Sequence, residues 1–347
     1  MRSEMSVAPG STKLPKFSSF LLPLNRVCSI SSPAFHAVEE TIRAAVESKN
    51  YEQIPDLLIL SKQSSQRNNP FLFLSNFSQI RRTQIIDDML QAFLPLRPRS
   101  RPLIAYSYLL SHTLQAPSPL PLSLAILQCI LRSGSRPALQ THLFLSSAWL
   151  HRRRQSHSVS NILLEMKSIR YFPDSTTCNY IISSLCGVDQ LPEAVKVLKG
   201  MAAAGCIPDV ESYGTVIAAM CSGRKTADAV DMVKQMVVKV GLVPSQGTVV
   251  KMVAALRANR EIRQAVEVID LLEREGYSVE FESYELTIEG CLECREFILA
   301  GKMAIEMTDR GFIPYIKVRQ KVVEGLASIG EWKLACAVRQ RFAELRS

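Results

Sequence analysis

Histidine and cysteine, the residues that most often bind metals or transfer protons, are placed in this chain in a way that favours neither role. Only Cys291 and Cys294 have the Cys-x-x-Cys spacing of half a zinc site. No second pair has this spacing and no histidine lies beyond residue 157, so we expect two helical core or boundary cysteines and no bound metal. The five histidines all lie in the first 157 residues: His36, His112, His142, His151 and His157. Because no nucleophile–histidine pair, paired carboxylates or phosphate-binding loop is visible, we expect a protein that is neither an enzyme nor dependent on a cofactor.

Two groups of arginines are the densest basic clusters. One contains Arg97, Arg99 and Arg101, and the other contains Arg152, Arg153 and Arg154. Either group is suited to contact the phosphates of a nucleic acid through charge, in a salt-dependent way. A solvated helix end is the alternative interpretation of each cluster.

Length and composition set limits on the architecture. The chain has 347 residues, of which 47% are hydrophobic, enough for two ordinary cores or one elongated array. Its net charge of +9 comes entirely from residues 1–174, which hold 20 basic and 10 acidic residues. This asymmetry permits a polyanionic partner without demonstrating one. No apolar run approaches the roughly 18 residues of a membrane span, so we expect no insertion into a membrane.

Residues 1–36 have the composition of an organellar transit peptide. Up to Val38 there is one acid, Glu4, against four basic residues and eight serines. Pro15 and Pro23 interrupt the apolar stretch, which argues against a secretory signal. We expect import into a mitochondrion, because the residues up to Cys28 resemble a matrix-processing site, with a plastid or an ordinary disordered tail as alternatives.

Four residue types recur through the C-terminal half of the chain with one shared period. Alanine recurs at steps of 35, 36, 35 and 35: Ala194, Ala229, Ala265, Ala300 and Ala335. Glycine recurs at steps of 36, 35 and 35: Gly205, Gly241, Gly276 and Gly311. Proline and methionine repeat at the same interval. A period of this length indicates stacked supersecondary units.

Each period has the pattern of a helical hairpin, most clearly over residues 175–209. An apolar face with spacings of three and four predicts the first helix: Cys178, Ile181, Ile182 and Leu185. Pro192 suits the start of a second helix, Gly205 suits its C-terminal cap, and Pro208 prevents it from continuing. The recurrent alanine lies in the second helix, where a small side chain lets the two helices approach closely.

One hairpin cannot bury both of its apolar faces, so we expect an all-α, right-handed α-solenoid of stacked 35-residue helix-turn-helix repeats. Four clear units are predicted, followed by a partial repeat: 175–209, 210–245, 246–280, 281–315 and 316–347. Two degenerate repeats are predicted over 103–174, and a helical region that would cap the array over 37–102. Six prolines in residues 95–121 predict loops or linkers there. Trp149 and Trp332 lie in apolar helical contexts, where we expect them to pack in the core.

The repeat resembles the pentatricopeptide repeat, and the chain is similar to its P-type, plant organellar members. The resemblance rests on the run from Cys178 and Asn179 to Cys186, and on Glu193-Ala194, Met201, Gly205 and Pro208-Asp209. Tetratricopeptide repeats have a period of 34 and an early Trp and Leu-Gly pair, which these units lack. The resemblance implies a non-catalytic protein that binds single-stranded RNA or a ribonucleoprotein and acts in organellar RNA processing, stability or translation.

The resemblance also implies that each unit reads one base, through a residue of its first helix and its last residue. In the unit 175–209 these are Asn179 and Asp209, a pair that resembles a uracil reader. The next unit offers Gly214 and Ser245, and the pairs in the two following units depart from the pattern: Val250 with Glu280, and Glu285 with Tyr315. The arginines named above would contact the RNA backbone. Because three of the four clear units lack an orthodox pair, a scaffold that binds organellar proteins, for instance in an organellar ribosome, is the alternative.

Overall fold

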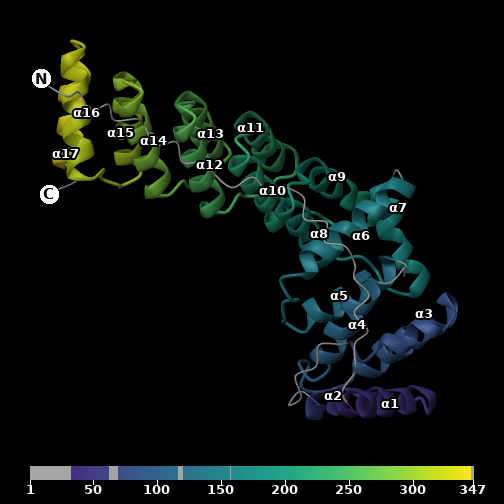
Figure 1. Cartoon of the computed structure of the whole chain (residues 1–347). Helices are drawn as coiled ribbons and strands as arrows, with labels where there is room; N and C mark the ends of the chain where they lie inside the picture. The colour runs from purple at the N-terminus through teal and green to yellow at the C-terminus, as the bar shows by residue number, and fades with distance from the viewer. Residues whose placement is uncertain (1–32, 62–68, 116–119, 157, 345–347) are drawn as a thin grey trace, which may run out of the picture.

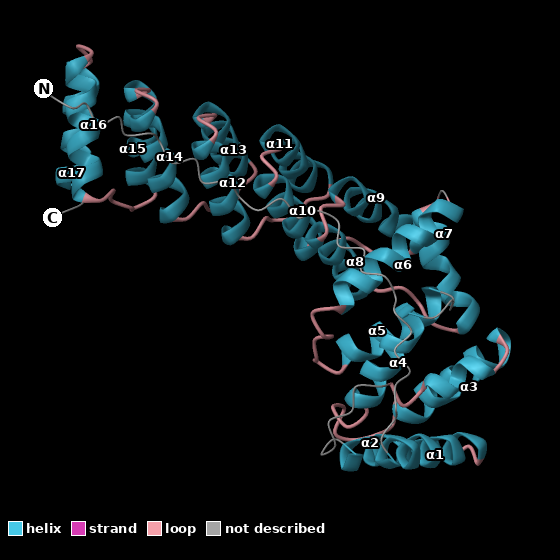
Figure 2. Cartoon of the chain, viewed as in Figure 1, coloured by secondary structure: helices cyan, strands magenta, loops and turns pink. Residues whose placement is uncertain are grey.

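The computed structural model describes residues 33–61, 69–115, 120–156 and 158–344, and these residues form an array of helices with no strand (Figures 1 and 2). The N-terminal part contains α1 (Pro33–Glu47), α2 (Ile54–Ser61) and α3 (Gln79–Phe93). Most of the predicted transit peptide, residues 1–32, lies outside the described residues, and α1 begins within its last four positions.

From α4 onward the helices form successive pairs. The first members are α4 (Leu103–Gln115), α6 (Thr141–Gln155), α8 (Ser175–Gly187), α10 (Val210–Ser222), α12 (Gln246–Ala258), α14 (Phe281–Glu293) and α16 (Ile316–Ser328). The second members are α5 (Leu120–Arg132), α7 (Val159–Leu164) continued by the 3-10 helix η3 (Glu165–Ile169), α9 (Leu191–Met201), α11 (Thr226–Lys234), α13 (Ile262–Arg274), α15 (Phe297–Asp309) and α17 (Trp332–Glu344). Among the prolines of residues 95–121, α4 forms between Pro102 and the segment 116–119, which lies outside the described residues.

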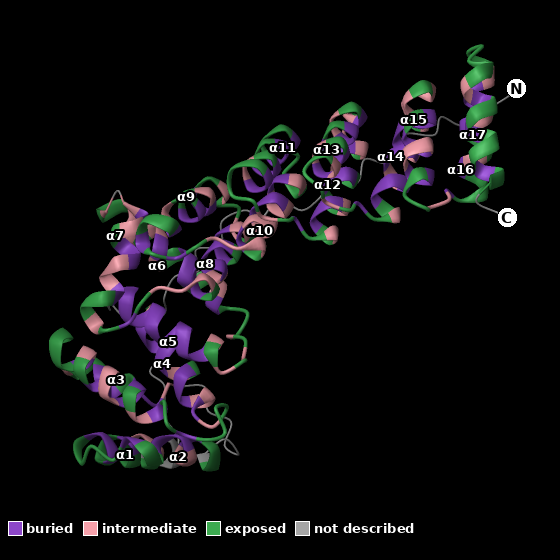
Figure 3. Cartoon of the chain, turned by 180° about the vertical axis from the view of Figure 1, so that it is seen from behind, coloured by how far each residue is buried: buried purple, intermediate pink, exposed green. Residues whose placement is uncertain are grey.

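First helices contact first helices of the neighbouring pairs, and the second helices line up beside them. Contacts join α6 to α8, α8 to α10, α10 to α12, α12 to α14 and α14 to α16. The pairs therefore stack into one bent row from α4 to α17 (Figure 1). Buried residues run along the middle of this row and exposed residues along its outside (Figure 3). The predicted all-α repeat fold is confirmed, and none of the described helices is long and apolar enough to cross a bilayer.

The recurrent glycines end their hairpins and the recurrent alanines are buried between helices, as their spacing predicted. Gly205, with φ of +86°, ends its hairpin in the left-handed region that a residue without Cβ adopts at little cost, and its three repeat equivalents have φ between +70° and +82°. Ala194, Ala229, Ala265 and Ala300 are completely buried, and Ala335 is 4% exposed. Close approach between units is also visible at Gly325, where a methyl group would overlap the ring of Phe297 from the preceding pair.

A second set of left-handed residues, which the sequence analysis missed, lies in the turns between the two helices of the five hairpins from α8 to α17. These residues also follow the repeat period: Asp189 (φ 57°), Arg224 (φ 56°), Arg260 (φ 60°), Arg295 (φ 58°) and Gly330 (φ 83°). Only the last is glycine, so the other four hold a conformation that costs a residue with a Cβ roughly 1 kcal/mol or more.

We therefore expect Arg224→Gly to raise the free energy of unfolding by about 1 kcal/mol. Arg224 is exposed and its side chain makes no hydrogen bond or ion pair with another described residue, so the substitution removes strain without removing a polar interaction. Urea unfolding followed by circular dichroism measures the change. The matched control is Arg339→Gly in the middle of α17, which we expect to cost about 1 kcal/mol through lost helix propensity. Equal effects of the two changes would contradict the strain argument.

Candidate functional site

Stacking of two units brings the predicted base-reading residues Asn179 and Asp209 into direct contact. Asn179 lies in the second turn of α8, and Asp209 immediately precedes α10. Asn179 Nδ2 donates to Asp209 Oδ1 at 3.0 Å and to Oδ2 at 3.2 Å. Ser212 Oγ donates to Asn179 Oδ1 at 2.5 Å, so the Asn179 amide is engaged at both ends and is 5% exposed.

The start of α10 fixes the position and charge of Asp209. Its Oδ1 accepts from the Ser212 amide at 2.8 Å, and the Ser212 hydroxyl accepts from the Asp209 amide at 3.1 Å, which completes a capping box. Burial alone would raise the pKa of Asp209, but hydrogen bonds from Ser212 and Asn179 outweigh it and hold the pKa below its ordinary value. At neutral pH the pair is therefore an ionised acceptor beside an amide donor.

The second predicted pair, Gly214 and Ser245, has the same backbone placement but fewer groups that can form hydrogen bonds. Ser245 is the N-cap of α12, and its hydroxyl accepts from the Thr248 amide at 3.3 Å. A Cβ at Gly214 would lie 3.1 Å from Thr248 Oγ1, so Gly214 faces the third residue of the next unit, as Asn179 faces Ser212. Without a side chain, Gly214 cannot hydrogen-bond to a base.

The two following pairs differ from the first in polarity and burial. Val250 is half-buried, and Glu280 makes no side-chain cap at the start of α14. Glu285 is 5% exposed, and its Oε1 accepts from the Tyr315 amide at 3.1 Å while its Oε2 is buried without a hydrogen-bond partner. The Tyr315 ring, 65% exposed, lies edge-on to Phe281 at 5.1 Å between centroids. The backbone positions of the pair therefore repeat along the row, but the side chains at these positions differ in polarity and charge.

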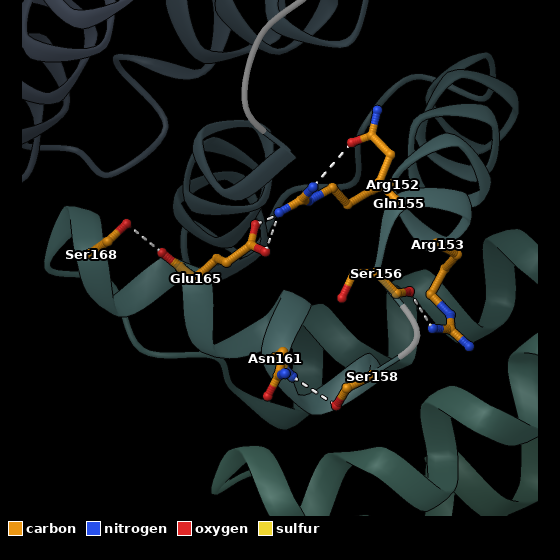
Figure 4. Close-up of polar contacts among 8 residues, drawn as sticks. All are labelled: Arg152, Arg153, Gln155, Ser156, Ser158, Asn161, Glu165 and Ser168. Atoms are coloured by element: carbon orange, nitrogen blue, oxygen red, sulfur yellow. Dashed lines mark hydrogen bonds and ion pairs between the residues drawn. The ribbon is translucent and has the colours of Figure 1, made fainter.

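The cluster 152–154 is largely occupied by contacts within the protein (Figure 4). Arg152 forms an ion pair with Glu165 and donates to Gln155 Oε1 at 3.0 Å. Arg153 forms an ion pair with Glu193 and donates to the Ser156 carbonyl at 2.7 Å. Arg154 is exposed, and its side chain makes no hydrogen bond or ion pair with another described residue. The structure thus leaves one of these three guanidinium groups without an internal partner.

The cluster 97–101 divides in a similar way. Arg101 donates from Nε to Asp56 Oδ1 at 2.9 Å and forms an ion pair with this carboxylate. Arg97 donates from Nη1 to the carbonyls of Leu94 at 3.1 Å and Leu96 at 3.0 Å. Arg99 is exposed, and its side chain makes no hydrogen bond or ion pair with another described residue. Arg97 and Arg99 also line a cavity together with Arg132 and Arg170, two residues that the sequence analysis missed.

Only Arg170 has a usable signal in the sequence. It lies 36 residues after Gly134 and 35 before Gly205, at the position where glycine ends a hairpin. Its φ of 64° lies in the same left-handed region as those two glycines. Arg132 has no such signal, because an isolated arginine at a helix end does not stand out from its neighbours.

The cysteine pair and one tryptophan lie where we expected, and the other tryptophan does not. Cys291 is buried in α14 and Cys294 caps its C-terminal end, and no cluster of potential metal ligands is found in the described part of the chain. Trp149 is completely buried, and its Nε1 donates to Glu193 Oε1 at 3.3 Å. The expectation of core packing is wrong for Trp332, which is 64% exposed, because no described helix lies beyond α17 to cover it.

Comparison with known proteins finds repeats of one kind. Models of the PPR repeat family and of the single PPR repeat match residues 173–222 and 211–239. A pentatricopeptide repeat-containing protein of Arabidopsis thaliana is 60% identical over 319 residues, which are 92% of each chain. A small ribosomal subunit protein of Arabidopsis thaliana is 32% identical over 66 residues, 19% of this chain and 16% of that protein.

Among solved structures, the maize pentatricopeptide repeat protein PPR10 is similar in fold. Its crystal structure alone is 12% identical with a TM-score of 0.40, over 90% of this chain and 55% of that one. Its complex with an 18-nucleotide psaJ RNA element is 18% identical with a TM-score of 0.36, over 89% of this chain and 48% of that one. The chain thus spans about half the length of these solved proteins.

Proposed function

The chain belongs to the pentatricopeptide repeat family, and from this premise we propose that it binds single-stranded RNA along its row of first helices, without catalysing a reaction, in organellar RNA processing, stability or translation. Repeats of this family read one base per unit with two or three side chains. The observation that carries the proposal is the contact between Asn179 and Asp209, which joins an amide donor and an ionised acceptor where two units meet.

The chemistry of the pair suits uracil. The ionised carboxylate of Asp209 accepts a hydrogen bond from the base N3–H, and the Asn179 amide donates to a neighbouring base carbonyl. Because the amide donates to Asp209 in the free protein, a bound base exchanges that hydrogen bond for its own. Arg99 and Arg154, which make no side-chain hydrogen bond or ion pair within the described protein, add affinity for phosphates that does not depend on sequence. Arg97, which donates only to backbone carbonyls, adds to the same positive charge. Gly214 and Ser245 add at most one hydroxyl contact.

The proposal is tested by fluorescence anisotropy with labelled 15-nucleotide oligouridine and oligocytidine. We expect Asn179→Ala to reduce the preference for oligouridine by about tenfold, because the base loses its amide donor. Asp209→Asn keeps an N-cap oxygen while removing the charge, so it separates base reading from helix capping. The matched control is Asn161→Ala in α7, an exposed position whose side chain makes no hydrogen bond with another described residue. The proposal fails if the wild-type protein binds neither oligonucleotide, or if both variants keep the control's preference.

We place this function in the mitochondrion, with the plastid as the alternative, on the basis of the acid-poor, serine-rich residues 1–36. Import of the full chain into isolated plant mitochondria and chloroplasts measures the choice directly. Protease-protected, shortened product in the mitochondria alone is the expected result. Product in the chloroplasts alone assigns the plastid.

A scaffold for organellar proteins is the second candidate, and the loss of the orthodox pair in the units spanning 210–315 favours it. Crosslinking of the tagged protein in isolated organelles, followed by sequencing of attached RNA, separates the two functions. A discrete RNA footprint that weakens in the Asn179→Ala/Asp209→Ala variant is expected for base reading. Ribosomal fragments alone, unchanged in that variant, would assign the chain to the scaffold class.

A further inference from the structure

A cavity of about 520 Å³ lies where the second helices of successive pairs end, before the unit that contains Asn179. Its wall is built by the C-terminal ends of α3 and α5, the first turn of α4 and the segments that follow α3 and η3. Its volume is within the range of about 300–1,000 Å³ that is typical of ligand sites. Four arginines line it: Arg97, Arg99, Arg132 and Arg170.

The charge around this cavity is positive. None of the described residues that line it is acidic. Two carboxylates outside the lining reduce the charge: Asp174 Oδ2 lies 3.0 Å from Arg132 Nη2, and Asp87 interacts with a tyrosine of the lining. Arg99 and Arg170 are exposed, and their side chains make no hydrogen bond or ion pair with another described residue. A concave surface lined by charges of one sign concentrates the potential and attracts ions of the opposite sign.

Helix capping explains only one of these arginines. Arg97 caps the end of α3 through its hydrogen bonds to the Leu94 and Leu96 carbonyls. Arg99 lies six residues beyond Phe93, where α3 ends, and a helix dipole acts only within about one turn of its terminus. Arg170 follows the five-residue helix η3 with φ of 64° and makes no side-chain hydrogen bond. Two guanidinium groups at the cavity therefore make no hydrogen bond or ion pair within the described protein.

An exposed aromatic ring completes the site. Phe172 lines the cavity two residues after Arg170, and its ring is 65% exposed. The backbone is held there, because Gln128 Nε2 donates to the Phe172 carbonyl at 2.8 Å. Lys167 Nζ lies 5.9 Å from the ring centroid. Basic grooves with exposed aromatic rings are the surfaces that hold single-stranded nucleic acids, through phosphate contacts and base stacking.

An ion pair connects the cavity to the unit of the base-reading pair. Asp174, the partner of Arg132, is the N-cap of α8, the helix that presents Asn179 five residues later. We propose that this cavity is a phosphate-binding subsite, in which Arg97, Arg99 and Arg170 hold phosphates of the RNA strand that extends from the Asn179–Asp209 pair toward the N-terminal helices. This proposal rests on the proposed RNA binding. The same chemistry would also suit a free nucleotide, so the test treats the two sources separately.

The test uses the full chain with the double variant Arg99→Gln/Arg170→Gln, which removes two exposed charges and breaks no hydrogen bond or ion pair of the described structure. The control is Arg339→Gln on α17, an exposed arginine whose side chain makes no hydrogen bond or ion pair with another described residue. Binding of the 15-nucleotide oligouridine is measured as a function of KCl concentration. The slope of log K against log salt is about −0.7 per neutralised phosphate for single strands. We expect the double variant to weaken binding roughly tenfold and to reduce the slope by about 1.4, with the control unchanged.

An unchanged slope in the double variant, with normal RNA binding by the wild-type protein, would overturn the proposal and leave the proposed function intact. If the wild-type protein binds no RNA, the proposed function fails. Calorimetry with uridine 5′-phosphate then tests whether the cavity binds the phosphate of a free nucleotide. Binding that is lost in the double variant but kept in Arg339→Gln supports a phosphate site for a free nucleotide. No binding of the nucleotide overturns the phosphate site as well.

Discussion

Replacing Trp149 by alanine is expected to lower the free energy of unfolding by about 3–5 kcal/mol, the usual cost of removing a large aromatic ring from a packed core. The indole is completely buried in α6, and its Nε1 donates to Glu193 Oε1 of α9 at 3.3 Å. The substitution therefore leaves a cavity and also removes a donor from a carboxylate that is 8% exposed. Arg153 and Lys196 still compensate the charge of Glu193.

The matched control for this prediction is Trp332→Ala. This second tryptophan is 64% exposed at the start of α17, so its loss is expected to change stability by no more than about 0.5 kcal/mol. Unfolding in urea is followed by circular dichroism at the helical band, because each variant removes one of the two tryptophan fluorophores. Similar midpoints for the two alanine variants would show that burial in this structure does not determine their contribution.

The period of the fold was predictable because its determinants are local. A glycine such as Gly205 ends a helix through its own positive φ, and an alanine such as Ala194 permits close packing through its own small volume. Both effects need only the residue and its immediate backbone, so a repeat in the sequence becomes a repeat in the structure. The left-handed arginines were missed because arginine has no preference for that conformation, and only the closing of the hairpin imposes it on Arg224.

Features that depend on distant parts of the chain could not be predicted in this way. Trp149 and Trp332 both lie in helices among apolar residues, and the helices beside them decide that one is buried and the other is exposed. Arg153 belongs to a basic cluster that suits phosphate binding, but its guanidinium group is paired with Glu193 from the next pair of helices. The arginines of the cavity come from segments that are 33 and 38 residues apart, so the sequence shows them as three separate helix ends.

The candidate site was predictable in its position and only partly in its chemistry. The resemblance to the repeat family placed Asn179 and Asp209 correctly at one junction, where they form a hydrogen bond. It placed Glu285 at the corresponding position three periods further along the row, where a carboxylate was an evident departure. The sequence did not show that this carboxylate is almost completely buried and satisfied through only one of its two oxygens.

Glu285→Gln is therefore expected to raise the free energy of unfolding at pH 7 by about 2 kcal/mol, because an ionised buried carboxylate with an unpaired oxygen is more costly than a neutral amide. Burial raises the pKa of Glu285 above its ordinary value. The Tyr315 amide opposes this shift, Glu289 reinforces it and Arg319 opposes it. Glutamine keeps an oxygen for the Tyr315 amide and carries no charge.

The pH dependence of this gain has a definite sign. A carboxyl group whose pKa is raised in the folded state makes the protein less stable as pH rises through the interval between the unfolded pKa, about 4.3, and the higher folded pKa. Below that interval Glu285 is protonated in both states, so the advantage of Glu285→Gln is expected to shrink toward zero near pH 4 and to be complete at pH 7. Urea unfolding at both pH values measures it, with Glu282→Gln as the control at an exposed position in the same helix. An advantage that is the same at both pH values, or that also occurs in the control, would show that the charge of Glu285 is not its cause.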